Sequence, residues 1–115
     1  MEKLFTNRTA VVTGGARGIG RAICQMLASH GARVAVNYQQ NDKGANETLA
    51  LIEKNAEKAI LVKGDVSRED EVTRLMQIVR EQLGPIDFLV NNAGIVRNEP
   101  HSEVTFANWK RMFEV

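Results

Sequence analysis

The sequence predicts an α/β fold in the form of a doubly wound parallel sheet. Short runs rich in apolar and β-branched residues alternate four times with helical stretches, the pattern of repeated strand–helix–strand units. Two of these runs, at 10–12 and 88–90, are apolar throughout, as in strands buried on both faces. Right-handed crossovers then give the strands the spatial order 3-2-1-4. With 115 residues, 43% of them hydrophobic, we expect a single domain over 1–115.

The first predicted strand and helix flank the densest glycine run of the chain. β-branched residues predict the strand over 9–13. Apolar residues spaced four apart predict a helix over about 18–30 that buries Ile19, Ile23 and Leu27 on one face. Gly31 then provides a natural stop for this helix.

A polar turn separates the second strand from the second helix. Val34 and Val36 alternate within a β-rich run, which predicts a strand over 33–38. The tetrapeptide Asn-Asp-Lys-Gly at 41–44 is typical of a turn, so we expect the helix to cover about 45–55. This helix has few apolar residues, which indicates an outer, half-exposed position.

The third and fourth strands are predicted over 59–63 and 86–90, with a helix between them. That helix should begin at Ser67, a good N-cap with an acid three residues on, and end at Gly84-Pro85. Its inner face should carry Val72, Leu75, Met76, Val79 and Leu83. Residues 91–100 should form a loop, and a last helix should start near Thr105.

Residues 13–20 read Thr-Gly-Gly-Ala-Arg-Gly-Ile-Gly and lie between a strand and a helix. Glycines there allow a sharp turn and a close approach to a ligand, and the following helix aims its N–H groups and positive dipole end at an anion. The pattern therefore favours a nucleotide or dinucleotide. It does not fit a P-loop, because Arg21 and Ala22 stand where Lys and Ser or Thr are needed. The alternative is a tight turn without a ligand.

Composition excludes several other classes of function. A net charge of +1 argues against a nucleic-acid surface built on bulk charge, and no apolar run or signal peptide points to a membrane. The single cysteine, Cys24, is expected to be a small packing residue in a cytoplasmic protein. His30 and His101 show no metal-binding spacing, so we predict no metal site.

Three separated motifs resemble those of the short-chain dehydrogenase/reductases. They are the glycine run at 13–20, Asp65-Val66, and Asn91-Asn92-Ala93-Gly94, in the order and spacing of that family. The resemblance covers essentially the whole chain and implies a Rossmann-type sheet, here incomplete. Within the family, residues 17–23 and 91–95 resemble those of the 3-oxoacyl-carrier-protein reductases, and sugar and alcohol dehydrogenases of the family share these residues.

The resemblance implies a dinucleotide site at the carboxyl edge of the sheet. The glycine run would hold the pyrophosphate, Asp65 and Val66 the adenine, and Asn92 with its neighbours the ribose and nicotinamide side. Two alternatives stay open: Asp65 as a turn or helix-cap residue, and Asn92 as a tie between the central strands. The expected cofactor-binding residues are Gly14, Gly15, Ala16, Arg17, Gly18, Ile19, Gly20, Tyr38, Asp65, Val66, Asn92, Ala93 and Gly94.

The end of the second strand favours NADP(H), with NAD(H) as the alternative. NAD-preferring relatives place an acid there for the ribose 2′-hydroxyl. In this chain the segment reads Asn-Tyr-Gln-Gln, and no carboxylate precedes Asp42. Arg17 can supply positive charge to a 2′-phosphate.

The resemblance also implies a reaction whose catalytic residues have no match in this chain. The family needs a serine, and a tyrosine followed by a lysine four residues later. The only tyrosine is Tyr38, and Asp42 stands four residues after it. We therefore expect the cofactor-binding half of an enzyme that acts on a small carbonyl or alcohol, homo-oligomeric when full length. The alternative is a noncatalytic nucleotide-binding module or partner subunit.

Overall fold

The computed structural model describes residues 3–92. The predicted loop beyond 92 and the helix expected from near Thr105 lie outside the described residues. Three helices alternate with four strands. The elements are β1 (Thr9–Val12), α1 (Gly18–Ser29), β2 (Arg33–Tyr38), α2 (Asp42–Ile52), β3 (Lys58–Lys63), α3 (Glu69–Leu83) and β4 (Phe88–Val90).

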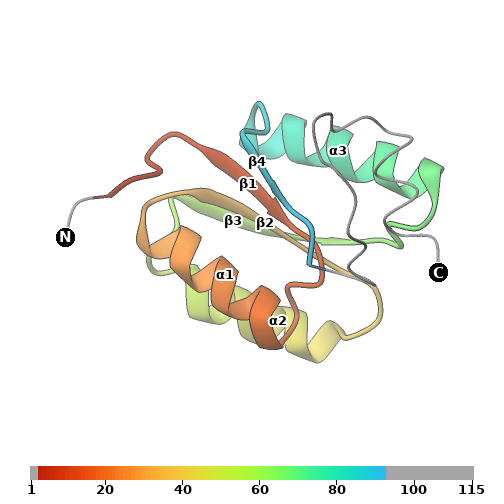
Figure 1. Cartoon of the computed structure of the whole chain (residues 1–115), viewed down its shortest axis with the longest axis horizontal. Helices are drawn as coiled ribbons and strands as arrows, with labels where there is room; N and C mark the ends of the chain where they lie inside the picture. Colours follow the sequence, from red (N-terminus) through yellow and green to blue (C-terminus); the bar gives the residue numbers. More distant parts are fainter. Residues whose placement is uncertain (1–2, 93–115) are drawn as a thin grey trace, which may run out of the picture.

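The four strands form one parallel sheet in the order β3-β2-β1-β4, which confirms the predicted topology. Helices α1 and α2 cover one face of the sheet and α3 covers the other (Figure 1). Because every strand runs in the same direction, the turns after β1, β2, β3 and β4 meet at one edge. The longest helix described has 15 residues, and no helix within 3–92 is long and apolar enough to cross a bilayer.

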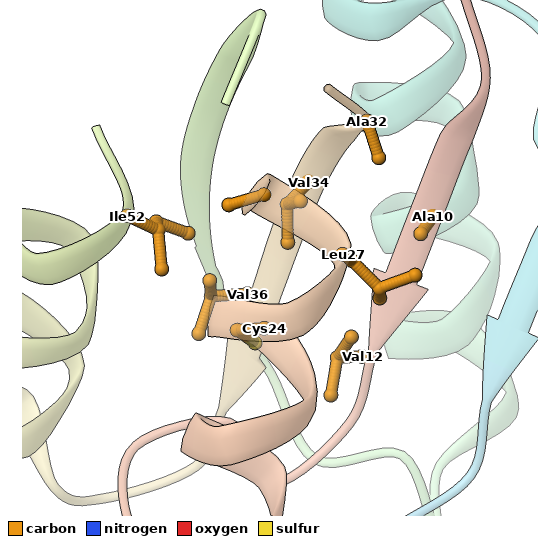
Figure 2. Packing of buried hydrophobic residues seen from close by; sticks show 9 residues of the cluster. Ala10, Val12, Cys24, Leu27, Ala32, Val34, Val36 and Ile52 are labelled. Carbon is orange, nitrogen blue, oxygen red and sulfur yellow. The ribbon is translucent and has the colours of Figure 1, made fainter. Parts of the chain in front are cut away.

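Successive side chains of β1 point to opposite faces and feed two separate cores. Ala10 and Val12 pack toward α1 with Cys24 and Val36, as Figure 2 shows. Val11 packs on the other face, toward α3. The α3 core contains Val11, Ala35, Val62, Val66, Val72, Leu75, Val79 and Leu83, so the predicted inner face of this helix is confirmed, with Met76 only partly buried.

The buried face of α1 agrees with the prediction in part, since Leu27 is buried and Ile23 packs against the core. Its buried residues are Gly20, Cys24, Leu27 and Ala28. Ile19 is 73% exposed, so its place on the inner face was wrong. Gly20 at the start of the helix lies close to the carbonyl oxygen of Gly14, so there is no room for a side chain at this position. Cys24 is buried as predicted, and burial raises the pKa of its thiol to about 12.

Helix α2 begins three residues earlier than predicted, within the tetrapeptide assigned to a turn. The side chain of Asn41 accepts a hydrogen bond from Gly44 N at 2.9 Å and so caps the helix. Asp42 therefore lies in the first helical turn. The same cap chemistry that favours turns can also start a helix.

The start of α3 also departs from the expectation. The N-cap position belongs to Arg68, and Ser67 does not cap the helix. The Ser67 hydroxyl instead donates to Asp65 Oδ1 at 2.7 Å, and the Ser67 N–H donates to the same atom at 2.9 Å. The predicted capping box is thus replaced by a local turn around Asp65.

Candidate functional site

An open cleft of about 410 Å³ lies at the carboxyl edge of the sheet, between the turn after β1 and the end of β2. This is the position at which doubly wound sheets bind ligands. Seven residues line it: Gly14, Ala16, Arg17, Tyr38, Gln39, Gln40 and Asn41. Four of these, Gly14, Ala16, Arg17 and Tyr38, are residues that the sequence predicted for the site.

Two glycines of the turn after β1 adopt backbone conformations that favour glycine. Gly14 has φ 65° and Gly18 has φ 60°. A Cβ on Gly18 would meet no atom within 4 Å, so open space lies beside it. Gly18 thus combines a left-handed backbone with room for a ligand.

The other two glycines are needed for internal packing. A Cβ on Gly20 would overlap the carbonyl oxygen of Gly14 and lie 2.6 Å from Asn92 Nδ2. A Cβ on Gly15 would lie 2.7 Å from a methyl group of Val36. These glycines let α1 and the turn pack closely on the sheet.

The exposed part of the turn presents backbone donors and a cation. Arg17, Gly18 and Ile19 are exposed, whereas Gly15 and Gly20 are buried. The first helical hydrogen bond runs from Arg21 N to Arg17 O, and among the described residues the N–H groups of Gly18 and Ile19 have no acceptor. The first turn of α1 contains no acidic residue. This end of the helix is therefore suited to an anion.

Asp42, which directly follows the lining residue Asn41, forms an ion pair with Lys63. Asp42 Oδ1 lies 3.1 Å from Lys63 Nζ, an exposed ion pair at the ends of α2 and β3. Burial raises the pKa of Tyr38, and the nearby Asp42 raises it further. Tyr38 lines the cleft.

Asp65 forms a turn between β3 and α3. Hydrogen bonds from the hydroxyl and then the N–H of Ser67 lower the pKa of its carboxyl. The Asp65 N–H donates to Glu71 Oε1 at 2.9 Å. Both bonds from Ser67 end at Oδ1 of Asp65. Within residues 3–92 no hydrogen bond to Oδ2 is found, so this oxygen can accept one from a ligand. The turn alternative left open for Asp65 is thus realised, and Val66 beside it is buried in the α3 core.

Asn92 joins the ends of β4 and β1. Its N–H donates to Thr13 Oγ1 at 2.9 Å, and its Nδ2 donates to Gly14 O at 3.1 Å. The tie between central strands, which the sequence left open, is therefore present. The other two predicted residues of this motif, Ala93 and Gly94, lie outside the described residues.

A second cavity of about 390 Å³ lies beside the first and shares Gln39 with it. Its lining residues are Gln39, Lys63, Gly64, Asp65, Glu71 and Arg74. It places the Asp65 turn next to the cleft. Over residues 3–92 there is no group of three or more His, Cys, Asp or Glu side chains that could hold a metal ion.

Sequence reasoning missed two side chains behind the glycine turn. Thr48 of α2 donates to Gly15 O at 2.8 Å, and Arg21 of α1 donates to Ala16 O at 2.7 Å. The sequence does place Thr48 on the inner face of an amphipathic helix, where a buried hydroxyl needs a hydrogen-bond partner. The sequence could not identify that partner.

The family model described as "short chain dehydrogenase" matches residues 8–115. The chain is 39% identical over 117 residues to glucose 1-dehydrogenase 2 of Bacillus subtilis, covering all of this chain and 45% of that protein. It is 41% identical over 101 residues to the short-chain dehydrogenase/reductase homolog YusS of B. subtilis, covering 88% of this chain and 93% of that protein.

Solved structures agree with these matches. A dehydrogenase/reductase from Sinorhizobium meliloti superimposes with a TM-score of 0.75 and 35% identity, over 94% of this chain and 43% of that one. The chain thus spans less than half the length of this structure and of the glucose dehydrogenase.

Proposed function

The chain belongs to the short-chain dehydrogenase family, and on this premise we propose that it is the dinucleotide-binding half of an oxidoreductase. The complete enzyme would interconvert a ketone and a secondary alcohol with NADP(H). The observation that carries the proposal is the cleft formed by the glycine turn and the end of β2, with exposed backbone donors at its rim.

The residues of the cleft fit a dinucleotide. Gly18 offers open space beside a left-handed backbone, and the adjacent N–H groups suit the two phosphates. The proposal assigns the adenine to the second cavity, because Asp65 lines this cavity and Gln39 lines both it and the cleft. When bound, the cofactor supplies or accepts a hydride. This chain's own residues bind and orient it.

The charges around the cleft favour NADP(H) over NAD(H). Arg17 is the one charged residue among those that line the cleft, and within residues 3–92 its guanidinium has no hydrogen-bond or ion-pair partner. Asp42, which could repel a 2′-phosphate, is paired with Lys63. An unpaired cation beside an open cleft favours an additional phosphate group.

A change of charge at Tyr38 tests this preference. We expect the wild-type chain to bind NADPH at least about tenfold more tightly than NADH, and Tyr38→Asp to reverse the order, because a carboxylate repels the 2′-phosphate and binds free hydroxyls. Fluorescence titration with both cofactors measures the ratio. Tyr38→Phe is the matched control and should keep the wild-type order. A wild type that prefers NADH would refute the choice of NADP(H).

The substrate and its subgroup are the finer parts of the proposal. The motif at 17–23 supports a 3-oxoacyl-carrier-protein reductase, whereas the relatives described above carry other names. A carbonyl or alcohol of low molecular mass fits either case. We further propose that the complete enzyme is cytoplasmic and forms a homo-oligomer, since enzymes of this family are commonly oligomeric.

The second candidate is a noncatalytic nucleotide-binding module or partner subunit. It is favoured by YusS, since this chain covers 93% of that relative, and by Tyr38, the only tyrosine, lying at the cofactor cleft. The coding sequence beyond Val115 discriminates between the candidates. A serine followed by Tyr-x-x-x-Lys in the same reading frame supports the enzyme, and a stop codon at that point supports the module.

A further inference from the structure

Four consecutive carbonyl oxygens of the glycine turn, at residues 14–17, all accept hydrogen bonds, from groups of α1, α2 and Asn92. Asn92 Nδ2 donates to Gly14 O, and the Arg21 N–H donates to Arg17 O at the start of α1. The two oxygens between them are held by side chains of the helices. Thr48 Oγ1 donates to Gly15 O, and Arg21 Nη2 donates to Ala16 O. The turn therefore presents no unpaired carbonyl oxygen from 14 to 17.

The two side chains form a connected chain of donors. Arg21 Nε donates to Thr48 Oγ1 at 3.0 Å, so the single hydroxyl hydrogen of Thr48 is available to a carbonyl. Gly15 O at 2.8 Å is closer to this hydroxyl than Gly44 O at 3.1 Å. Thr48 is fully buried, so solvent cannot replace this bond.

Helix α2 reaches the turn through a close backbone contact. A Cβ on Gly44 would lie 2.6 Å from Ala16 O, so a larger residue would push α2 away. Arg21 Nη2 also donates to Gly44 O at 3.1 Å and pairs with Glu47 at 3.2 Å. Glu47 offsets the charge of Arg21, which therefore serves as a hydrogen-bond donor to the backbone. Arg17, by contrast, lines the cleft, and within residues 3–92 it has no ion-pair partner.

We propose that Thr48 and Arg21 are positioning residues for the diphosphate of the cofactor. By drawing the carbonyl oxygens of Gly15 and Ala16 toward α2, they keep negative partial charge away from the phosphates. The N–H groups of Gly18 and Ile19 then face the anion without a competing oxygen nearby. This inference rests on the proposed function and assigns it two residues that do not line the cleft.

A pair of substitutions at Thr48 tests the proposal. Thr48→Val keeps the shape and removes the hydroxyl, and Thr48→Ser keeps the hydroxyl. Isothermal titration of the whole chain uses NADPH, and adenosine 2′-monophosphate as a probe that lacks the diphosphate. We expect Thr48→Val to weaken NADPH binding about tenfold, because Gly15 O loses a buried donor, and to change affinity for the monophosphate less than about twofold. Thr48→Ser should stay near the wild type for both.

Each outcome separates the inference from the proposed function. A wild type that binds neither ligand refutes the proposed function. A wild type that binds NADPH together with an unchanged Thr48→Val refutes only the positioning role, and so does an equal loss for both ligands, which indicates a general structural effect. Thermal melting followed by circular dichroism identifies variants that do not fold. Should Thr48→Val not fold, Arg21→Met replaces it, with the same expected difference between the two ligands.

Discussion

The turns after β1 and β3 both lead from a parallel strand into a helix at the same edge of the sheet. Both helices have an arginine at the N-cap in extended conformation, and neither arginine caps through its side chain. Around α3, Arg68 lies 3.4 Å from both Asp70 and Glu71, and three acids occupy the first turn. Around α1, the first turn has no acid, and Arg17 has no partner within the described part of the chain.

The difference shows which helix end is available to an external anion. At α3 the protein supplies its own negative charge to the helix dipole, so the end is already compensated. At α1 the carbonyl oxygens of Gly15 and Ala16 accept hydrogen bonds from Thr48 and Arg21, and the first helical turn contains no acid. Within residues 3–92 neither Arg17 nor the first N–H groups of the helix have a partner. A helix N-terminus is therefore informative about function only together with the charges that the chain itself places there.

The largest expected effect comes from Gly20→Ala, which disturbs the packing behind the α1 turn. The new Cβ would overlap Gly14 O, so α1 must move away from the turn. We expect a loss of about 3 kcal/mol in the free energy of unfolding and no detectable NADPH binding. Urea denaturation and fluorescence titration measure the two effects. Ala22→Ser, on the exposed side of the same helix, is the control and should leave both nearly unchanged. Normal binding by Gly20→Ala would contradict the packing role.

A smaller effect is expected when the start of α1 is given the acidic character of α3. Ile19→Glu places a carboxylate in the first turn at a position that is 73% exposed, so the fold should tolerate it. The charge should weaken NADPH binding by on the order of tenfold through repulsion of the phosphates, while the melting temperature stays level or rises slightly. Ile19→Gln is the neutral control. Equal affinities for the Glu and Gln variants would show that no anion binds at this end.

The smallest expected effect concerns the α3 turn at acid pH. Hydrogen bonds from Ser67 lower the pKa of Asp65 in the folded chain. The ionised Asp65 carboxylate therefore contributes its full stabilisation of the fold above about pH 4, the ordinary pKa of an aspartate. This contribution is lost as the pH falls through the lowered pKa of the folded chain. Melting temperatures between about pH 2.5 and 7 should fall less steeply at the acid end for Asp65→Asn than for the wild type. Parallel curves would show that this turn contributes no acid sensitivity.

The arrangement of strands and helices was accessible from the sequence. β2 has the predicted bounds, and β1, β3 and β4 differ from prediction by one or two residues. The larger errors lie at the ends and faces of helices, and α2 both begins and ends three residues before its predicted bounds. Residues 41–44 were assigned to a turn, although Asn41 caps α2 there. Ser67 was taken as a cap, although its hydroxyl donates to Asp65. Polar residues serve turns and caps equally well, so local chemistry does not distinguish them.

The candidate site was accessible only in part. The glycine motif predicted where the chain turns, and the alternation of apolar residues predicted the sheet, because both depend on neighbours within a few residues. Which glycine lies beside open space and which is closely packed could not be predicted from the sequence. Gly18 and Gly20 look alike in the sequence, yet open space lies beside one and the Gly14 carbonyl beside the other.

The sequence by itself determined the parallel α/β sheet, its strand order and the edge at which the turns after the strands meet. Only the tertiary structure decided how that edge is built. The bonds from Thr48 to Gly15 and from Arg21 to Thr48 join residues 33 and 27 positions apart, on different elements. Periodicity reports which face of an element is buried, but the partner on that face depends on the packing of the other elements. That packing brings Thr48 and Arg21 within hydrogen-bond distance of the carbonyl oxygens of Gly15 and Ala16.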